Sequence, residues 1–136
     1  FAEQGRASTA QDLLTATQIA GEMYEAFGPM LQKHNVFVCP TNALPAVRAD
    51  HDSGVDKLAI NGVEVDPMLG WCLTYPFNML SRCPVIAVPS GNAKNNVPTG
   101  IQIVGKTFDD VSVFRAAAAL EKVKPWLDCA ERRPSL

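Results

Sequence analysis

The chain has 136 residues, of which 47% are hydrophobic and 19% charged, and its formal net charge is -2. This length suits one domain with one core, and the composition argues against intrinsic disorder. The small negative charge gives no electrostatic reason to expect nucleic acid or an anionic membrane as a partner. The longest apolar runs, Val85–Val88 and Ala116–Leu120, are too short to cross a bilayer.

The chain begins Phe1-Ala2-Glu3, without an initiator methionine or a basic-then-apolar signal region. We expect it to start inside a longer sequence, although a processed or cloned start would look the same.

The four cysteines, at positions 39, 72, 83 and 129, show no C-x-x-C spacing of a zinc or redox motif. Cys39, Cys72 and Cys83 lie in apolar surroundings, where a free cysteine behaves as a small hydrophobic residue. This pattern favours reduced, structural cysteines and a cytoplasmic protein.

The first predicted element is a long helix. Either Ser8 or Thr9 can cap it, and Asp12 follows in the first turn. Apolar residues then recur every three or four positions and make one helical face, namely Leu13, Ala16, Ala20, Met23 and Phe27. Pro29 lacks an N–H and clashes with the preceding turn, so we expect a kink or a fresh start there, before an end near Lys33.

Three short apolar runs predict strands. Val36–Cys39, which ends before a proline, is typical of a fully buried strand in a parallel or mixed sheet. Val85–Val88 and Ile101–Val104 are predicted as two further buried strands. Because their connection is too short for a helical crossover, we expect these two strands to be antiparallel neighbours.

Between these strands the sequence predicts a hairpin and a second helix. Asn61-Gly62 separates two apolar runs and suits a type I′ turn, after the loop 41–54. Asp66-Pro67 is typical of an N-cap followed by the first helical residue, so we expect a helix that runs to about Met79. Pro76 would bend or break this helix.

A last helix is predicted over Val111–Val123, opened by Asp109-Asp110 and ended by Pro125. Buried strands among amphipathic helices predict an α/β fold, with a mixed sheet and flanking helices. No internal repeat divides the chain, so residues 1–136 are expected to form a single domain segment.

No motif in the sequence carries catalysis by itself. Neither a Gly-rich phosphate-binding loop nor a metal-ligand spacing occurs, so we expect no cofactor and no metal. The run His51-Asp52-Ser53 contains the residue types of a hydrolytic triad. However, directly adjacent side chains diverge and cannot converge on one reacting atom, so a polar loop is expected there.

Three segments, in order, carry a resemblance to a known family. They are Val36–Thr41 with Pro45-Ala46, then Thr74–Asn78 leading to Pro84–Gly91, and finally Pro98–Gly105 followed by an alanine-rich helix. This succession resembles the C-terminal part of the amidase signature family, and the resemblance extends from about Tyr24 to Glu121. It implies that the chain is the C-terminal portion of a larger amidase signature domain.

The resemblance implies hydrolysis of an amide, or transfer of its ammonia, by a serine nucleophile. In that family a second serine, a lysine and an oxyanion hole of backbone N–H groups complete the machinery, all in a Gly/Ser-rich N-terminal half. This chain has no such region, so we assign no catalytic residue in it. The implied partner is the missing N-terminal half, or a second chain that carries it.

The resemblance further implies that residues 71–78 border the pocket for a small-molecule amide substrate. The candidate substrate-binding residues are Trp71, Thr74, Tyr75 and Phe77. Trp71 implies an apolar or aromatic acyl group, because relatives with charged substrates have an acidic residue near this position. The residues alone leave open the alternative that Trp71 and Phe77 are ordinary core.

Two polar residues are expected to have structural roles. Asn78 would bond to neighbouring backbone, and Gln102, between two isoleucines, would bond into the missing half. Ser81-Arg82 replaces a common Thr-Gly of the family, and Asn96 replaces a common glycine at a position of positive φ. These departures leave the substrate class open.

The rival hypothesis is a non-catalytic fragment, a binding module or a scaffold. A stable isolated domain of this size should not expose a broad apolar patch, whereas part of a divided enzyme should expose one.

Overall fold

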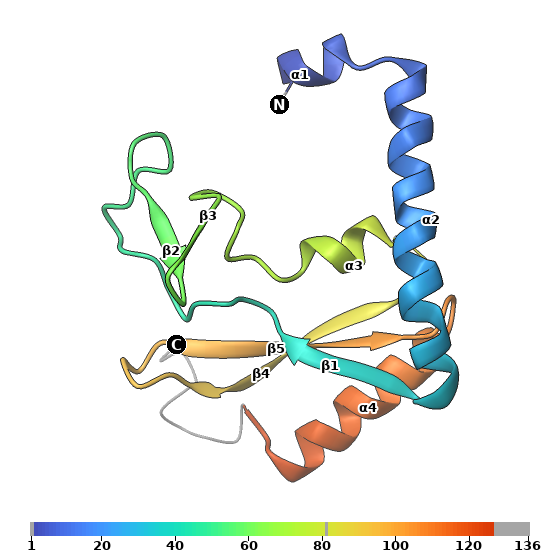
Figure 1. Cartoon of the computed structure of the whole chain (residues 1–136). Helices are drawn as coiled ribbons and strands as arrows, with labels where there is room; N and C mark the ends of the chain where they lie inside the picture. The colour runs from blue at the N-terminus through green and yellow to red at the C-terminus, as the bar shows by residue number, and fades with distance from the viewer. Residues whose placement is uncertain (1, 81, 127–136) are drawn as a thin grey trace.

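The computed structural model describes residues 2–80 and 82–126 (Figure 1). The elements in chain order are α1 (Ala2–Ala7), α2 (Ala10–Lys33), β1 (Val36–Pro40), β2 (Leu58–Ile60), β3 (Val63–Val65), α3 (Tyr75–Met79), β4 (Val85–Asn92), β5 (Pro98–Gly105) and α4 (Asp110–Val123). The expected α/β class with flanking helices is confirmed. Within the described residues the strands form one sheet of order β1-β5-β4 and a separate β2-β3 hairpin, and every strand pair is antiparallel.

The capping of α2 follows the sequence prediction. The Thr9 hydroxyl accepts a hydrogen bond from the Asp12 N–H at 3.2 Å, and the Asp12 carboxylate accepts from the Thr9 N–H at 2.7 Å. This reciprocal pair is a capping box. The expected fresh start at Pro29 is wrong, because α2 continues through it to Lys33. Buried Leu31, two residues from the end, anchors this part of the helix in the core and offsets the lost hydrogen bond.

The strands are less buried than their apolar sequences predict. Val38 in β1 is 49% exposed and Val85 in β4 is 41% exposed, so the prediction of fully buried strands is wrong for both. These strands are the two edges of the sheet, whereas β5 lies between them and holds the buried Ile103 and Val104. The predicted antiparallel pairing of β4 with β5 is confirmed.

Helices cover both faces of the β1-β5-β4 sheet, with α2 and α3 on one side and α4 on the other (Figure 1). Successive strand residues point to opposite faces, so β5 supplies both cores. The first core comprises Leu31, Leu80, Cys83 and Val104, and the second comprises Ile103, Val113 and Ala117.

The hairpin of β2 and β3 forms where it was predicted. Asn61 has φ 51° and Gly62 has φ 80°, which are the positive values that a type I′ turn requires at both central residues. The register pairs Ile60 with Val63 across this turn. The Asn-Gly signal is therefore confirmed.

The helix predicted from Asp66 is wrong. The Asp66 carboxylate accepts hydrogen bonds from the N–H groups of Met68 and Leu69, as an N-cap would, but only a turn follows. The helix in this region is α3, which begins at Tyr75. Pro76 lies in its first turn, where a missing N–H does no harm, so this proline opens the helix instead of breaking it.

The last helix is confirmed. Asp109 is its N-cap, and the carboxylate accepts hydrogen bonds from the N–H and the hydroxyl of Ser112. The helix ends at Val123, two residues before Pro125, as expected.

Candidate substrate-facing site

The segment that contains the predicted substrate-binding residues is tied to the end of β1. The Ala43 N–H donates to the Trp71 carbonyl at 2.8 Å, and the Leu73 N–H donates to the Thr41 carbonyl at 2.9 Å. An antiparallel bridge joins Asn42 to residue 72 between them. The loop after β1 and residues 71–73 therefore form a short antiparallel pairing, which continues the edge of the sheet.

The Gln102 side chain adds two hydrogen bonds to this attachment. Its side chain lies fully buried on the central strand, and Nε2 donates to the carbonyls of Pro40 at 3.0 Å and Leu73 at 2.8 Å. Both hydrogen bonds lie within this chain, whereas the sequence led us to expect a bond to a part outside it. The sequence signal was visible as a polar amide between two isoleucines, but its partners are 62 and 29 residues away.

Three of the predicted substrate-binding residues lie in the attached segment 71–73 or directly after it. Trp71 is half-buried, and its indole N–H donates to the Met68 carbonyl at 3.1 Å. Thr74 is the N-cap residue of α3, where its carbonyl accepts from the Asn78 N–H at 3.1 Å. Tyr75, the first residue of α3, is 44% exposed. The backbone here is anchored, while aromatic surface remains accessible.

Phe77 lies differently, because it packs into the first core. Its ring centroid is 5.6 Å from that of Phe27 on α2 and 5.8 Å from that of Phe37 on β1, and the latter two rings are 5.5 Å apart. The three rings border an apolar hollow of about 410 Å³ between α2 and α3, which is also lined by Met23, Ala26, Met30, Pro76 and Leu80. Phe77 thus has the packing contacts of a core residue.

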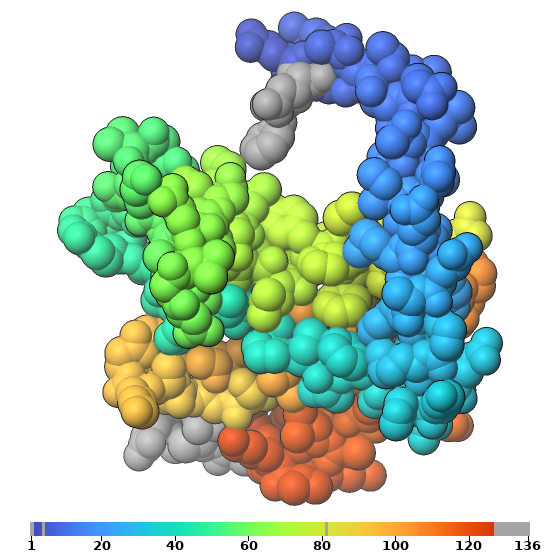
Figure 2. All heavy atoms as spheres, in the orientation of Figure 1, coloured from blue at the N-terminus to red at the C-terminus, as the bar shows by residue number. Residues whose placement is uncertain are grey.

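Several large apolar side chains are exposed on the same side of the sheet. The first half of α2 arches away from the rest of the molecule, and an open space separates it from α3 (Figure 2). Along this arch Leu13 is 70% exposed and Leu14 is 63% exposed, and Met79 on α3 is 49% exposed. Exposed apolar side chains on this part of α2 are what the hypothesis of a divided enzyme predicts.

A second hollow, of about 490 Å³, lies between α2 and the end of α3. Arg82 lines it beside Tyr24, whose hydroxyl accepts a hydrogen bond from the Thr107 hydroxyl at 2.8 Å. The hollow supplies the room that an arginine needs in place of a glycine. Ser81 lies outside the described residues. Asn96 has φ 63°, as expected where it replaces a glycine.

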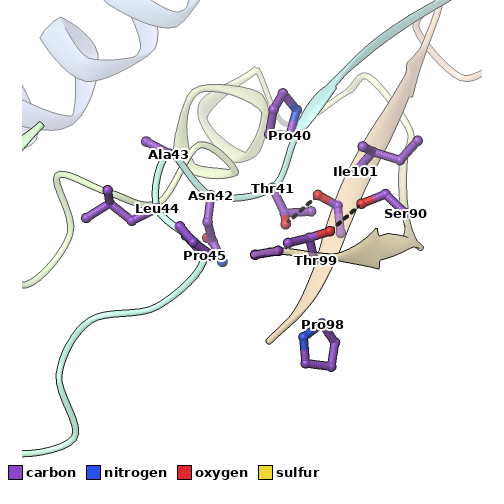
Figure 3. Close-up of a pocket in the computed structure, with 12 residues that line it drawn as sticks. Pro40, Thr41, Asn42, Ala43, Leu44, Pro45, Ser90, Pro98, Thr99 and Ile101 are labelled. Carbon is purple, nitrogen blue, oxygen red and sulfur yellow. Dashed lines mark hydrogen bonds between the residues drawn. The ribbon is translucent and has the colours of Figure 1, made fainter. Parts of the chain in front are cut away.

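At the opposite end of β5 the hydroxyl groups of three residues gather in a smaller hollow of about 280 Å³ (Figure 3). The Thr41 hydroxyl donates to the Gly100 carbonyl at 3.1 Å, and the hydroxyls of Ser90 and Thr99 lie 2.9 Å apart. Thr99 in turn donates to the Gly91 carbonyl at 3.1 Å. These hydroxyls hold the ends of the strands together, and the partner of Ser90 is another hydroxyl instead of a general base.

The other groups considered for catalysis, His51 and the cysteines, have contacts that indicate structural roles. The His51 ring donates from Nε2 to the Pro67 carbonyl at 3.0 Å and lies 3.5 Å from Asp56, so it does not pair with its two sequence neighbours. Burial raises the pKa of the Cys39 and Cys83 thiols, which makes them poor nucleophiles. They and Cys72 are free of disulfides, while Cys129 lies outside the described residues.

Two further properties concern the part of the chain that the structure describes. Across residues 2–80 and 82–126, no three His, Cys, Asp or Glu side chains come together as a metal site. In these same two ranges, none of the helices combines the length and hydropathy needed to cross a bilayer.

Comparison with known proteins agrees with this geometry. The family model described as Amidase matches residues 1–114. The chain is 32% identical over 122 residues to an acylamidase from Rhodococcus erythropolis, and the match covers 88% of this chain and 24% of that protein. It is also 32% identical over 131 residues to a fatty acid amide hydrolase from Medicago truncatula, and this match covers 93% of this chain and 20% of that protein.

Among solved structures, a bacterial aryl acylamidase of the amidase signature enzymes superposes with a TM-score of 0.76 and 28% identity. The match covers 93% of this chain and 26% of that one. The chain thus spans about a quarter of the length, or less, of each of these three relatives. On the family match over residues 1–114 and this shared fold, the chain belongs to the amidase signature family.

Proposed function

We propose that this chain forms the C-terminal part of an amidase that converts a small carboxamide into a carboxylate and ammonia. Membership of the family supports the reaction class, and relatives named acylamidase and aryl acylamidase support an amide substrate. The nucleophilic serine, its lysine relay and the oxyanion hole are supplied by the rest of the enzyme. The free cysteines at positions 39, 72 and 83 suit a cytoplasmic location for it.

In this reaction the serine Oγ attacks the carbonyl carbon, and the carbonyl oxygen carries negative charge in the tetrahedral intermediate. The C–N bond then breaks, the nitrogen takes up a proton, and ammonia departs. The acyl group remains on the serine as an ester. Water attacks this ester, releases the carboxylate and restores the serine. The role of this chain is to bind the acyl group and to keep solvent away from it.

The observation that carries the proposal is the anchored aromatic segment from Trp71 to Tyr75. Two backbone hydrogen bonds hold residues 71–73 on the loop after β1, so the side chains next to them keep their places. The indole N–H of Trp71 is already satisfied by the Met68 carbonyl, so the ring offers only apolar contact. An apolar or aromatic acyl group fits such a wall, whereas a charged one would lose its hydration without gaining a partner.

The partner of this chain is the remainder of the amidase, either on the same polypeptide or on a second one. The exposed apolar residues of α2, with Leu13 at 70% and Ile19 at 44%, need a cover. The remainder of a relative amounts to about three quarters of its length, which is large enough to supply that cover. Burial against it would also close the substrate site from one side.

Trp71→Ala in the complete enzyme tests this proposal. We expect kcat/KM for aromatic amides to fall about tenfold relative to that for acetamide, which corresponds to about 1.4 kcal/mol of lost acyl contact. The assay follows ammonia release over a series of aliphatic and aromatic amides. Phe114→Ala is the matched control, because Phe114 is 64% exposed on α4 across the sheet.

The control variant should leave the ratio between aromatic and aliphatic amides unchanged. A Trp71→Ala enzyme that loses stability but keeps this ratio would show that Trp71 is ordinary core. An enzyme that releases ammonia from no amide would overturn the reaction itself.

A further inference from the structure

Gln102 is a polar side chain in the most buried place of the fold. It lies on the central strand β5, has no exposed surface, and precedes the apolar Ile103 and Val104. Burying an amide is unfavourable unless its hydrogen bonds are replaced. Such a residue therefore requires a reason that packing alone does not supply.

The hydrogen bonds show what the amide does. Nε2 carries two N–H groups and uses both of them, toward the carbonyls of Pro40 and Leu73. Oε1 is buried and has no hydrogen-bond partner among the described residues. Rotating the amide would place this oxygen against two carbonyl oxygens, so the donors determine the orientation. The fold tolerates one unpaired acceptor and gains a bridge between two backbone carbonyls.

The two bridged carbonyls belong to the two sides of the site. Pro40 ends β1, and Leu73 lies between Trp71 and Tyr75 in the substrate-facing segment. The Leu73 N–H also points to the sheet edge, where it donates to the Thr41 carbonyl at 2.9 Å. Both backbone polar groups of Leu73 are therefore held from the β1-β5 side.

We propose that Gln102 is a positioning residue that holds the acyl-group wall, Trp71 to Tyr75, at a set distance from the sheet. The inference rests on the proposed function of that wall. Gln102 does not contact substrate and acts through Leu73. Its loss releases residues 71–75, so the pocket binds aromatic acyl groups less selectively, while the sheet itself stays formed.

The test is Gln102→Met in the full protein, which keeps the length of the side chain and removes the donor. Amide hydrogen exchange is measured by NMR or mass spectrometry for Leu73 and Ala43, whose N–H groups join the wall to the loop after β1. We expect exchange at these two amides to accelerate at least tenfold more than at Val104 in β5. The ratio of kcat/KM between aromatic amides and acetamide should fall at least threefold.

Val104→Ala is the matched control, because Val104 is fully buried on the same strand. It should speed exchange across the whole sheet and leave the substrate ratio unchanged. If Gln102→Met does not fold, Gln102→Asn serves as the test variant. Its side chain is one C–C bond too short to reach both carbonyls, so we expect the exchange pattern and the substrate ratio predicted for Gln102→Met.

Uniform acceleration of exchange in the Gln102 variants, equal at Leu73 and Val104, would overturn the proposal. So would accelerated exchange at the wall with an unchanged substrate ratio. If the unmodified protein hydrolysed no amide, the proposed function would fail, and the exchange pattern would still decide whether Gln102 holds residues 71–75.

Discussion

Phe77 offers a sharp test of how the structure divides packing from substrate contact. Its ring lies 5.6 Å from Phe27 and 5.8 Å from Phe37, and it is half-buried against the first core. Replacing a fully buried phenylalanine by alanine costs about 3–5 kcal/mol, so half-burial predicts a loss of about 1.5–2.5 kcal/mol for Phe77→Ala. Tyr75→Ala, two residues earlier and 44% exposed, should change the free energy of unfolding by only about 0.5 kcal/mol.

The measurement is the free energy of unfolding from urea titration, followed by tryptophan fluorescence. A double-mutant cycle with Phe27→Leu and Phe77→Leu isolates the contact between the two rings, for which we expect a coupling of about 0.5–1.5 kcal/mol. A Phe77→Ala protein as stable as the unmodified one, with an altered preference among amides, would refute the placement of this ring in the core. Phe77 would then join Trp71 among the proposed substrate contacts.

Two further predictions concern a pair of glycine substitutions and the N-cap of α4. Gly105→Ala should lower the free energy of unfolding by about 1–3 kcal/mol, because the new Cβ would lie 2.7 Å from Val113 Cγ1. Gly21→Ala, on the exposed face of α2 with no atom within 4 Å, should raise it by up to about 1 kcal/mol; thermal melts compare the pair, and equal melting temperatures would contradict both. The hydroxyl and the N–H of Ser112 hold the pKa of the Asp109 carboxyl below its ordinary value, so its cap is fully stabilising above about pH 3.9 and is lost as the pH falls through the lowered value. Asp109→Asn keeps a cap that does not titrate, so its helical circular dichroism should fall less on acidification than that of the unmodified protein, and an equal fall would count against this assignment.

Signals that depend on a few neighbouring residues were predicted well from the sequence. Thr9, one of the two predicted caps of α2, the Asn61-Gly62 turn and the Asp109 cap all formed as expected, and the reciprocal bond from Asp12 to Thr9 was an addition. Each of them is decided by contacts within four residues, so the sequence contains both partners side by side. The short helix α1 was not predicted.

Errors arose where a local signal competed with a distant contact. Asp66 caps a turn as its sequence indicates, but no helix follows, because residues 71–73 pair with the loop after β1 instead. Pro76 looked like a helix breaker because the preceding helix was assumed. Once the helix begins at Tyr75, the same proline is in a favourable position.

The candidate site shows the same division. The sequence pointed to residues 71–78 through resemblance to a family, and it left open whether Trp71 and Phe77 face substrate or core. The structure puts Phe77 among two other rings from α2 and β1, and leaves Tyr75 at the surface. Ring contacts between residues 40 and 50 positions apart cannot be deduced from composition or spacing.

By itself, the sequence determined the family resemblance, the local caps and turns, and the order of most elements, because these depend on short patterns of residue type. Only the tertiary structure decided which strands are edges, which hydrogen bonds Gln102 makes, and which face of α2 remains uncovered. The physical reason is that burial and side-chain pairing depend on which distant segments meet. In this chain Pro40, Leu73 and Gln102 meet only when the sheet has formed.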